Sequence, residues 1–165
     1  MTPQISTLVE CEAWNELEGF EALAGEVIAR AVAVTKIKLA RGAEVSLLLC
    51  DDARIREINR AWRGLDKPTN VLSFPAAPRA MLAKSPAVGD IAIAHETVAR
   101  EALEEGKTFR DHYMHMVVHG FLHLLGYDHE TDAEAEEMEA LEVSVLQQLG
   151  VADPYASFDL DLTDR

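Results

Sequence analysis

Three histidines at positions 119, 123 and 129 lie in an otherwise apolar segment that contains a glycine at position 126. An α-helix repeats every 3.6 residues, so His119 and His123 lie one turn apart on the same helix face. Gly126 can adopt a left-handed conformation that ends the helix and lets the chain turn back. His129 can then approach the first two imidazoles. The spacing predicts a metal site on a helix and the turn after it.

The predicted ligands are His119, His123 and His129, and we expect them to hold one Zn²⁺ per chain. Three imidazoles suit zinc best, although nickel, copper or cobalt would also be accepted. Three protein ligands leave the fourth zinc position open for water, which is the arrangement of a catalytic site. A rival set containing His115 would spread its ligands over about 12 Å of straight helix, too far for one ion.

Gly120 separates this segment from a known class of peptidases. The spacing matches the metzincin signature H-E-x-x-H-x-x-G-x-x-H, except that Gly120 replaces the glutamate that serves as general base. A zinc metallopeptidase would therefore need a carboxylate from elsewhere in the chain. A non-catalytic protein with a structural zinc would need a fourth ligand, for which Asp128 is the only close candidate. The sequence pattern is therefore compatible with a zinc metallopeptidase, with a structural zinc protein, and with a zinc hydrolase that acts on another substrate.

Residues 119–129, read as H-G-x-L-H-L-x-G-Y-D-H, resemble the signature of the YbeY endoribonucleases. Residues 59–75, which contain T-N-V-L-S-F-P, and Gly89–Ile93 agree with the family in the same order. The resemblance covers about residues 45–150. It implies an α+β fold and a zinc-dependent endoribonuclease that is specific for single strands. The implied role is ribosomal RNA maturation, at the 3′ end of 16S RNA, and ribosome quality control.

Arg63 is the residue that we expect to contact the phosphate. The resemblance implies that the arginine ahead of Thr69–Pro75 lines an RNA-binding cleft near the metal. Cleavage of a phosphodiester builds negative charge on non-bridging oxygens, which a guanidinium stabilises through two hydrogen bonds. We predict Arg63 and the zinc ligand His119 as catalytic residues. A surface ion pair between Arg63 and Asp66 is the alternative.

Several other polar residues remain without a predicted role. Asp128 and Glu96 are carboxylates that could act as the general base, and the sequence assigns neither. We expect core or surface positions for the three remaining histidines, at positions 95, 112 and 115.

The charge distribution restricts where RNA can bind. The chain has 165 residues and a formal net charge of −14, which argues against a simple nucleic-acid-binding protein. Residues 1–29 carry −6, residues 30–110 carry +4 and residues 111–165 carry −12. RNA contact is therefore expected through a local patch, where basic residues cluster between Arg54 and Lys67. The implied partners are single-stranded or precursor ribosomal RNA and the ribosome, with ribosomal proteins or a GTPase at the acidic flanks; no DNA is expected.

The length predicts one zinc-dependent hydrolase domain over residues 1–152, followed by a loosely held acidic tail over residues 153–165. No apolar run approaches the length of a membrane span, and the start lacks the features of a secretion signal, so a cytoplasmic protein is expected. With only two cysteines, Cys11 and Cys50, buried reduced thiols are favoured over a disulfide.

The pattern of apolar residues predicts an α+β fold, with a small mixed sheet of about four strands and about five helices. The expected strands are residues 4–14, 44–50, 71–74 and 88–95, and the expected helices are residues 19–38, 51–62, 96–105, 108–126 and 131–150. Residues 75–86 hold three prolines and are expected to form a flexible loop. The inward face of the last helix is assigned to Met138, Leu141, Val145 and Leu149.

Overall fold

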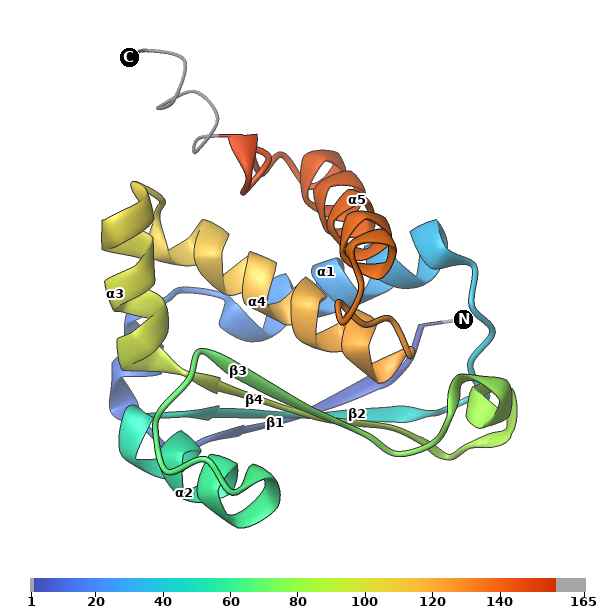
Figure 1. The fold of residues 1–165 in the computed structure, drawn as a ribbon, viewed down its shortest axis with the longest axis horizontal. Helices are drawn as coiled ribbons and strands as arrows, with labels where there is room; N and C mark the ends of the chain where they lie inside the picture. The colour runs from blue at the N-terminus through green and yellow to red at the C-terminus, as the bar shows by residue number, and fades with distance from the viewer. Residues whose placement is uncertain (1, 157–165) are drawn as a thin grey trace.

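A four-stranded mixed sheet forms the centre of the fold in the computed structural model, which describes residues 2–156 (Figure 1). The strands are β1 (Gln4–Val9), β2 (Glu44–Cys50), β3 (Val71–Pro75) and β4 (Ala87–Ala94). Their spatial order is β1-β2-β4-β3, with β3 antiparallel to β4 and the other pairs parallel. The predicted α+β fold with a mixed sheet is confirmed.

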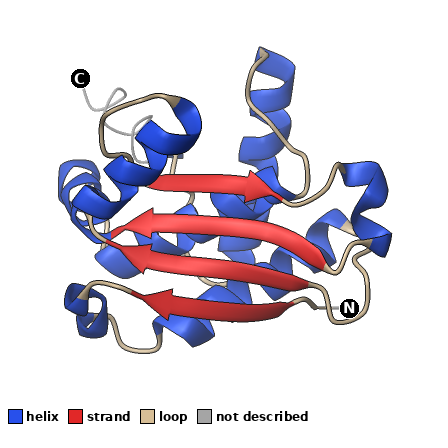
Figure 2. Cartoon of the chain, turned by 90° about the horizontal axis from the view of Figure 1, so that it is seen from below, coloured by secondary structure: helices blue, strands red, loops and turns tan. Residues whose placement is uncertain are grey.

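The helices lie unevenly on the two faces of the sheet. On one face lie α1 (Phe20–Thr35) and α4 (Phe109–Leu124), with α3 (His95–Glu105) beside α4 and α5 (Asp132–Gln148) packed over both α1 and α4 (Figure 1). Of the described α-helices, α2 (Asp52–Arg63) alone lies on the other face, and much of that face has no helix in front of it (Figure 2). The main core is therefore on the side of α4, the helix that carries the histidines.

The apolar runs of the central strands follow from their positions. In β2, Val45, Leu47 and Leu49 are buried against the helical layer, and Cys50 ends the strand as a buried free thiol. Ser46 and Leu48, which alternate with them, are only half-buried, and Leu48 packs against the smaller apolar cluster that contains Ile55 of α2. Cys11, the other free thiol, is half-buried and follows β1 rather than lying in it.

Side-chain caps fix where the helices begin. Asp51 accepts a hydrogen bond from the amide of Arg54 at the start of α2, at 2.8 Å. Thr108 caps α4 in the same way, and Thr131 forms a reciprocal capping box with Glu134 at the start of α5. A hydroxyl or carboxylate at this position satisfies an amide that has no partner within the helix.

Two sequence predictions of local structure were wrong. The first strand ends at Val9 rather than residue 14, because Glu12–Glu16 form a 3₁₀-helix (η1) that buries Trp14, whose indole donates to the carbonyl of Cys50 at 2.9 Å. The expected flexible loop contains a second 3₁₀-helix, η2 (Arg79–Lys84), anchored by Leu82, which is 1% exposed. In both cases a single buried side chain ties an irregular segment to the core.

The C-terminal segment is only partly described. Residues 153–156 follow α5, and Tyr155 reaches back to α4 and α5 through hydrogen bonds. The rest of the predicted acidic tail, residues 157–165, lies outside the described residues. None of the described helices is both long and apolar enough to cross a membrane.

Candidate metal centre

The three predicted ligands come together at the end of α4. His119 and His123 lie one helical turn apart with ring centroids at 4.7 Å, and His129 lies 5.7 Å and 5.0 Å from them. One ligand nitrogen from each of the three residues lies within 4.8 Å of the other two. No Cys, Asp or Glu of the described chain joins this group.

The turn after α4 returns His129 to the helix. Gly126 has a φ of 98°, in the left-handed region that favours glycine. The amide of Tyr127 donates to the carbonyl of Leu122 at 3.1 Å and so closes the turn. From η2, Arg79 donates to the carbonyl of Leu125 at 2.8 Å, and its guanidinium lies 4.2 Å from the centroid of the Tyr127 ring. Local chain geometry and one distant arginine therefore both hold the turn.

Hydrogen bonds orient two of the imidazoles. The Nδ1 of His123 lies 2.9 Å from the carbonyl oxygen of Tyr127, and the Nδ1 of His119 lies 2.9 Å from the Oε2 of Glu142. A carbonyl and an ionised carboxylate can only accept, so both Nδ1 atoms carry the proton. In a neutral ring the lone pair is then on Nε2, where it can bind a metal.

Electrostatics keeps the site in the form that a metal requires. Burial, reinforced by the neighbouring His119 and His129, lowers the pKa of His123 from 6.5 to about 4. The ring is therefore neutral at pH 7. A neutral imidazole with a free lone pair is the form that coordinates a divalent metal. Together with its two neighbours, His123 forms a group of three converging imidazoles, a donor set that fits a zinc ion.

Glu142 is a site residue that the sequence analysis missed. It lies on α5, is only 1% exposed, and accepts from both His119 and His115. Burial disfavours the charged carboxylate, but the hydrogen bonds from these two histidines outweigh burial and lower the pKa of Glu142 to about 2. The sequence does contain one indication of this role. Glu142 lies four residues after Met138 and three before Val145, so a charged residue occupies the apolar face of the helix.

Gly120 faces the sheet rather than the site. A Cβ at this position would lie 3.0 Å from a methyl of Ile91 and 3.1 Å from the hydroxyl of Ser73, which donates to the carbonyl of Gly120. Because α4 approaches β3 and β4 this closely, even a Cβ at this position would crowd its neighbours, which would have to shift by a few tenths of an ångström. A glutamate at this position, as in the metzincin signature, would start toward the sheet rather than toward the three histidines.

An open cleft of about 640 Å³ gives access to the three histidines. Arg63 lines this cleft together with Ser73 and the histidines, and its Nη2 donates to the carbonyl of Ser73 at 3.4 Å. Asp66 pairs with Arg56 at 2.8 Å, and no ion pair joins it to Arg63. The structure thus places the predicted arginine and the predicted ligands in the same cleft.

The two carboxylates considered as a general base lie in different places. Asp128 lines the cleft, where its Oδ1 accepts from the amide of His129 at 2.8 Å. Glu96 lies at the start of α3 and accepts from the amide of Asp52, and it does not line the cleft. Glu130, which was not considered, also lines the cleft.

The other histidines have partners outside the triad. His112 is buried and pairs with Glu101 at 2.8 Å. His95 begins α3 and packs edge-on against Trp14, with centroids 5.1 Å apart. His115 is buried against Glu142, so it is a core residue that also touches the support of His119.

These observations define a class of protein: a single α+β domain with a candidate three-histidine metal centre at the base of an open cleft. Comparison with known proteins places the chain within that class. A family model described as Endoribonuclease YbeY matches residues 9–150. The chain belongs to the YbeY endoribonuclease family.

Individual relatives agree with this family. A protein of Methylocella silvestris named Endoribonuclease YbeY is 55% identical over 155 residues, which cover 94% of this chain and 87% of that protein. A protein of the same name from Nitrobacter winogradskyi is 54% identical, covering 94% and 83%. A solution structure from Thermotoga maritima superposes with a TM-score of 0.55 at 27% identity, covering 88% of this chain and 91% of that one.

Proposed function

We propose that the protein is a zinc-dependent endoribonuclease that cleaves single-stranded RNA in the maturation of ribosomal RNA. Membership of the YbeY endoribonuclease family supports the reaction and the RNA substrate. The observation that carries the mechanism is the cleft that Arg63 shares with His119, His123 and His129. The cleft places a guanidinium that can bind a phosphate beside three imidazoles that can bind a metal ion.

His119, His123 and His129 would hold the zinc ion through their Nε2 atoms. Zinc bound in this way would lower the pKa of a bound water toward about 7 and polarise a phosphoryl oxygen. Tyr127 and Glu142 fix two of the rings in the required tautomer through their oxygens. These residues therefore prepare the site before substrate arrives.

Arg63 would contact the scissile phosphate. Its guanidinium is held by the carbonyl of Ser73 and lies over the ring of Phe74, 5.9 Å from the centroid. These contacts leave other N–H groups for an oxygen that gains charge as the bond breaks. A single strand of RNA is flexible enough to bend into an open cleft, whereas a paired duplex is wide and stiff.

Two observations weigh against the alternatives. A peptidase would need a general base in place of Gly120, and Glu142, the one buried carboxylate among the described residues, is already bonded to His115 and His119. A structural zinc would need a fourth ligand, and none of the described residues supplies one. Asp128 is bonded to a backbone amide instead.

The test is cleavage of a labelled single-stranded RNA with the sequence of the 16S 3′ end, by protein of measured zinc content. We expect about one zinc per chain in the wild type and its loss in His123→Ala, together with activity. Arg63→Gln should keep zinc and lose about 10²- to 10³-fold in rate. Arg110→Gln, whose arginine pairs with Asp111 instead, is the control and should match the wild type.

The outcomes separate the alternatives. Equal cleavage by the wild type and both site variants would contradict the proposal, since it would come from a contaminating nuclease. Cleavage of an unstructured peptide by the zinc-loaded protein, without RNA cleavage, would favour the peptidase. Adding precursor ribosomes to the same assay tests the proposed role in 16S maturation and ribosome quality control in the cytoplasm, including any need for ribosomal proteins or a GTPase.

A further inference from the structure

The carboxylate of Glu142 is the centre of a buried hydrogen-bond network. It lies between α4 and α5 and is 1% exposed, where a carboxylate without partners would be strongly destabilising. Its Oε2 accepts from the Nδ1 of His119 at 2.9 Å. Its Oε1 accepts from two other donors, and the position of this oxygen sets the direction of Oε2.

The first of these donors is His115, whose Nε2 lies 2.6 Å from Oε1. Burial lowers the pKa of His115 more than Glu142 raises it, so the ring is neutral and carries its single proton on Nε2. The Nδ1 of this ring is then unprotonated, and it is buried with no hydrogen-bond partner among residues 2–156. The nearest hydrogen-bond acceptor of this ring is therefore Glu142.

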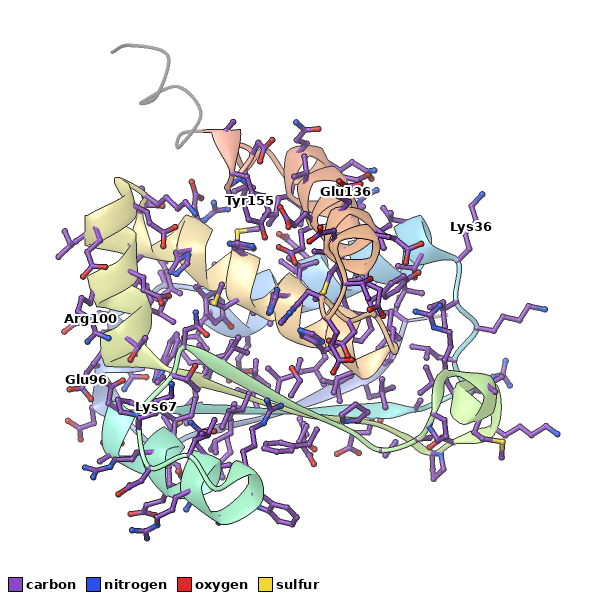
Figure 3. All side chains as sticks on the ribbon, in the orientation of Figure 1. Lys36, Lys67, Glu96, Arg100, Glu136 and Tyr155 are labelled. Atoms are coloured by element: carbon purple, nitrogen blue, oxygen red, sulfur yellow. The ribbon has the colours of Figure 1, made fainter. Side chains whose placement is uncertain are left out.

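The second donor is Tyr155, from the segment that follows α5. Its hydroxyl lies 2.6 Å from Oε1 of Glu142 and 3.3 Å from Nε2 of His115, and its ring packs edge-on against that of His115, with centroids 5.6 Å apart. Figure 3 shows Tyr155 above α4 and beside α5. A short bond from a hydroxyl to a carboxylate is charge-assisted and directional.

We infer that Tyr155 is a positioning residue for the metal centre, acting through Glu142 on the ligand His119. The inference rests on the proposed zinc site and extends it to a segment beyond residues 9–150, the part of the chain that matches the family model. With Tyr155 and His115 both on Oε1, the carboxylate plane is fixed and Oε2 points at His119. Without the hydroxyl, the carboxylate can turn and the ring of His119 is less firmly held.

The test measures zinc affinity by competition with a chromophoric chelator, on the full chain. Glu142→Gln should weaken zinc binding by about 10- to 100-fold, and Tyr155→Phe by about tenfold, because groups that orient metal ligands have effects of this size. Tyr113→Phe is the matched control, since it also removes a tyrosine hydroxyl bonded at 2.8 Å, but to the carbonyl of Phe20. Its zinc affinity should be unchanged.

Two further readouts separate positioning from a general loss of stability. The visible spectrum of the Co²⁺-substituted protein should change in Tyr155→Phe and stay unchanged in Tyr113→Phe, even if both variants melt at lower temperature. In the metal-free protein, ¹⁵N shifts of the His119 ring should show Nδ1–H in the wild type and a mixture of tautomers in Tyr155→Phe.

The possible results are distinguishable. Wild-type affinity and an unchanged cobalt spectrum in Tyr155→Phe, with Glu142→Gln impaired, would overturn the role of Tyr155 and leave the zinc centre intact. A wild-type protein that binds no zinc would overturn the proposed metal centre, and the inference with it.

Discussion

At the scale of single residues, Gly120 sets how closely α4 approaches the sheet. Gly120→Ala should lower the free energy of unfolding by about 1 to 2 kcal/mol, because crowding against Ile91 and Ser73 outweighs the gain in helix propensity. Gly25→Ala is the control: it lies in α1 with its nearest contact at 4.0 Å, and should stabilise by about 0.5 to 1 kcal/mol. Urea unfolding measures both, and a stabilised Gly120→Ala would contradict the packing argument.

His123 should make the stability of the metal-free protein depend on pH. Its pKa is about 4 in the folded chain and near 6.5 when unfolded, so between these values the unfolded state binds the additional proton. The stabilising effect is complete above pH 6.5 and is lost as the pH falls toward 4. The melting temperature of the wild type should therefore fall relative to that of His123→Gln over this range. A constant difference between the two proteins would contradict the prediction.

At the scale of elements, η2 and the turn after α4 act as one unit. Arg79→Gln removes the bond to the carbonyl of Leu125 and the cation–π contact with Tyr127, together worth about 1 to 2 kcal/mol. Since Tyr127 orients His123, we expect faster amide exchange in the turn and weaker zinc binding. Met81→Ala, an exposed residue of the same 3₁₀-helix, is the control. Equal amide exchange rates in both variants would show that local hydrogen bonds stabilise the turn without Arg79.

The element scale also shows how far the sequence could predict this site. Helical spacing and one glycine locate His119, His123 and His129, because these relations are local along the chain. Glu142 and Tyr155 reach the site from α5 and the segment after it. Both are distant from α4 in sequence, so no local pattern predicts that they lie close to its histidines in space. A charged residue on the apolar face of α5 was the one available signal. The 3₁₀-helices were missed for the same reason, since each depends on one long-range burial.

At the scale of the whole molecule, the charge of −14 limits how the protein can hold RNA. Arg60, Arg63 and Lys67 of the basic segment form no ion pair with a described residue, and Arg63 lines the cleft, whereas Arg54 and Arg56 are paired with acids. α5 begins with a strongly acidic face that would repel a phosphate backbone. RNA binding should therefore involve few phosphate contacts, all of them on the small surface that these unpaired basic residues form.

This restriction predicts a weak dependence on salt. Each phosphate contact to a single strand contributes about −0.7 to the slope of log K against log salt concentration, so three contacts give about −2. Fluorescence anisotropy of a labelled single-stranded RNA measures the slope, with His123→Ala as the background so that the RNA stays intact. Adding Arg63→Gln should make the slope shallower by about 0.7, and adding Arg110→Gln should not change it. A slope several times steeper, or one that Arg63→Gln leaves unchanged, would mean that RNA binds on another surface and that the cleft does not guide the strand to the metal centre.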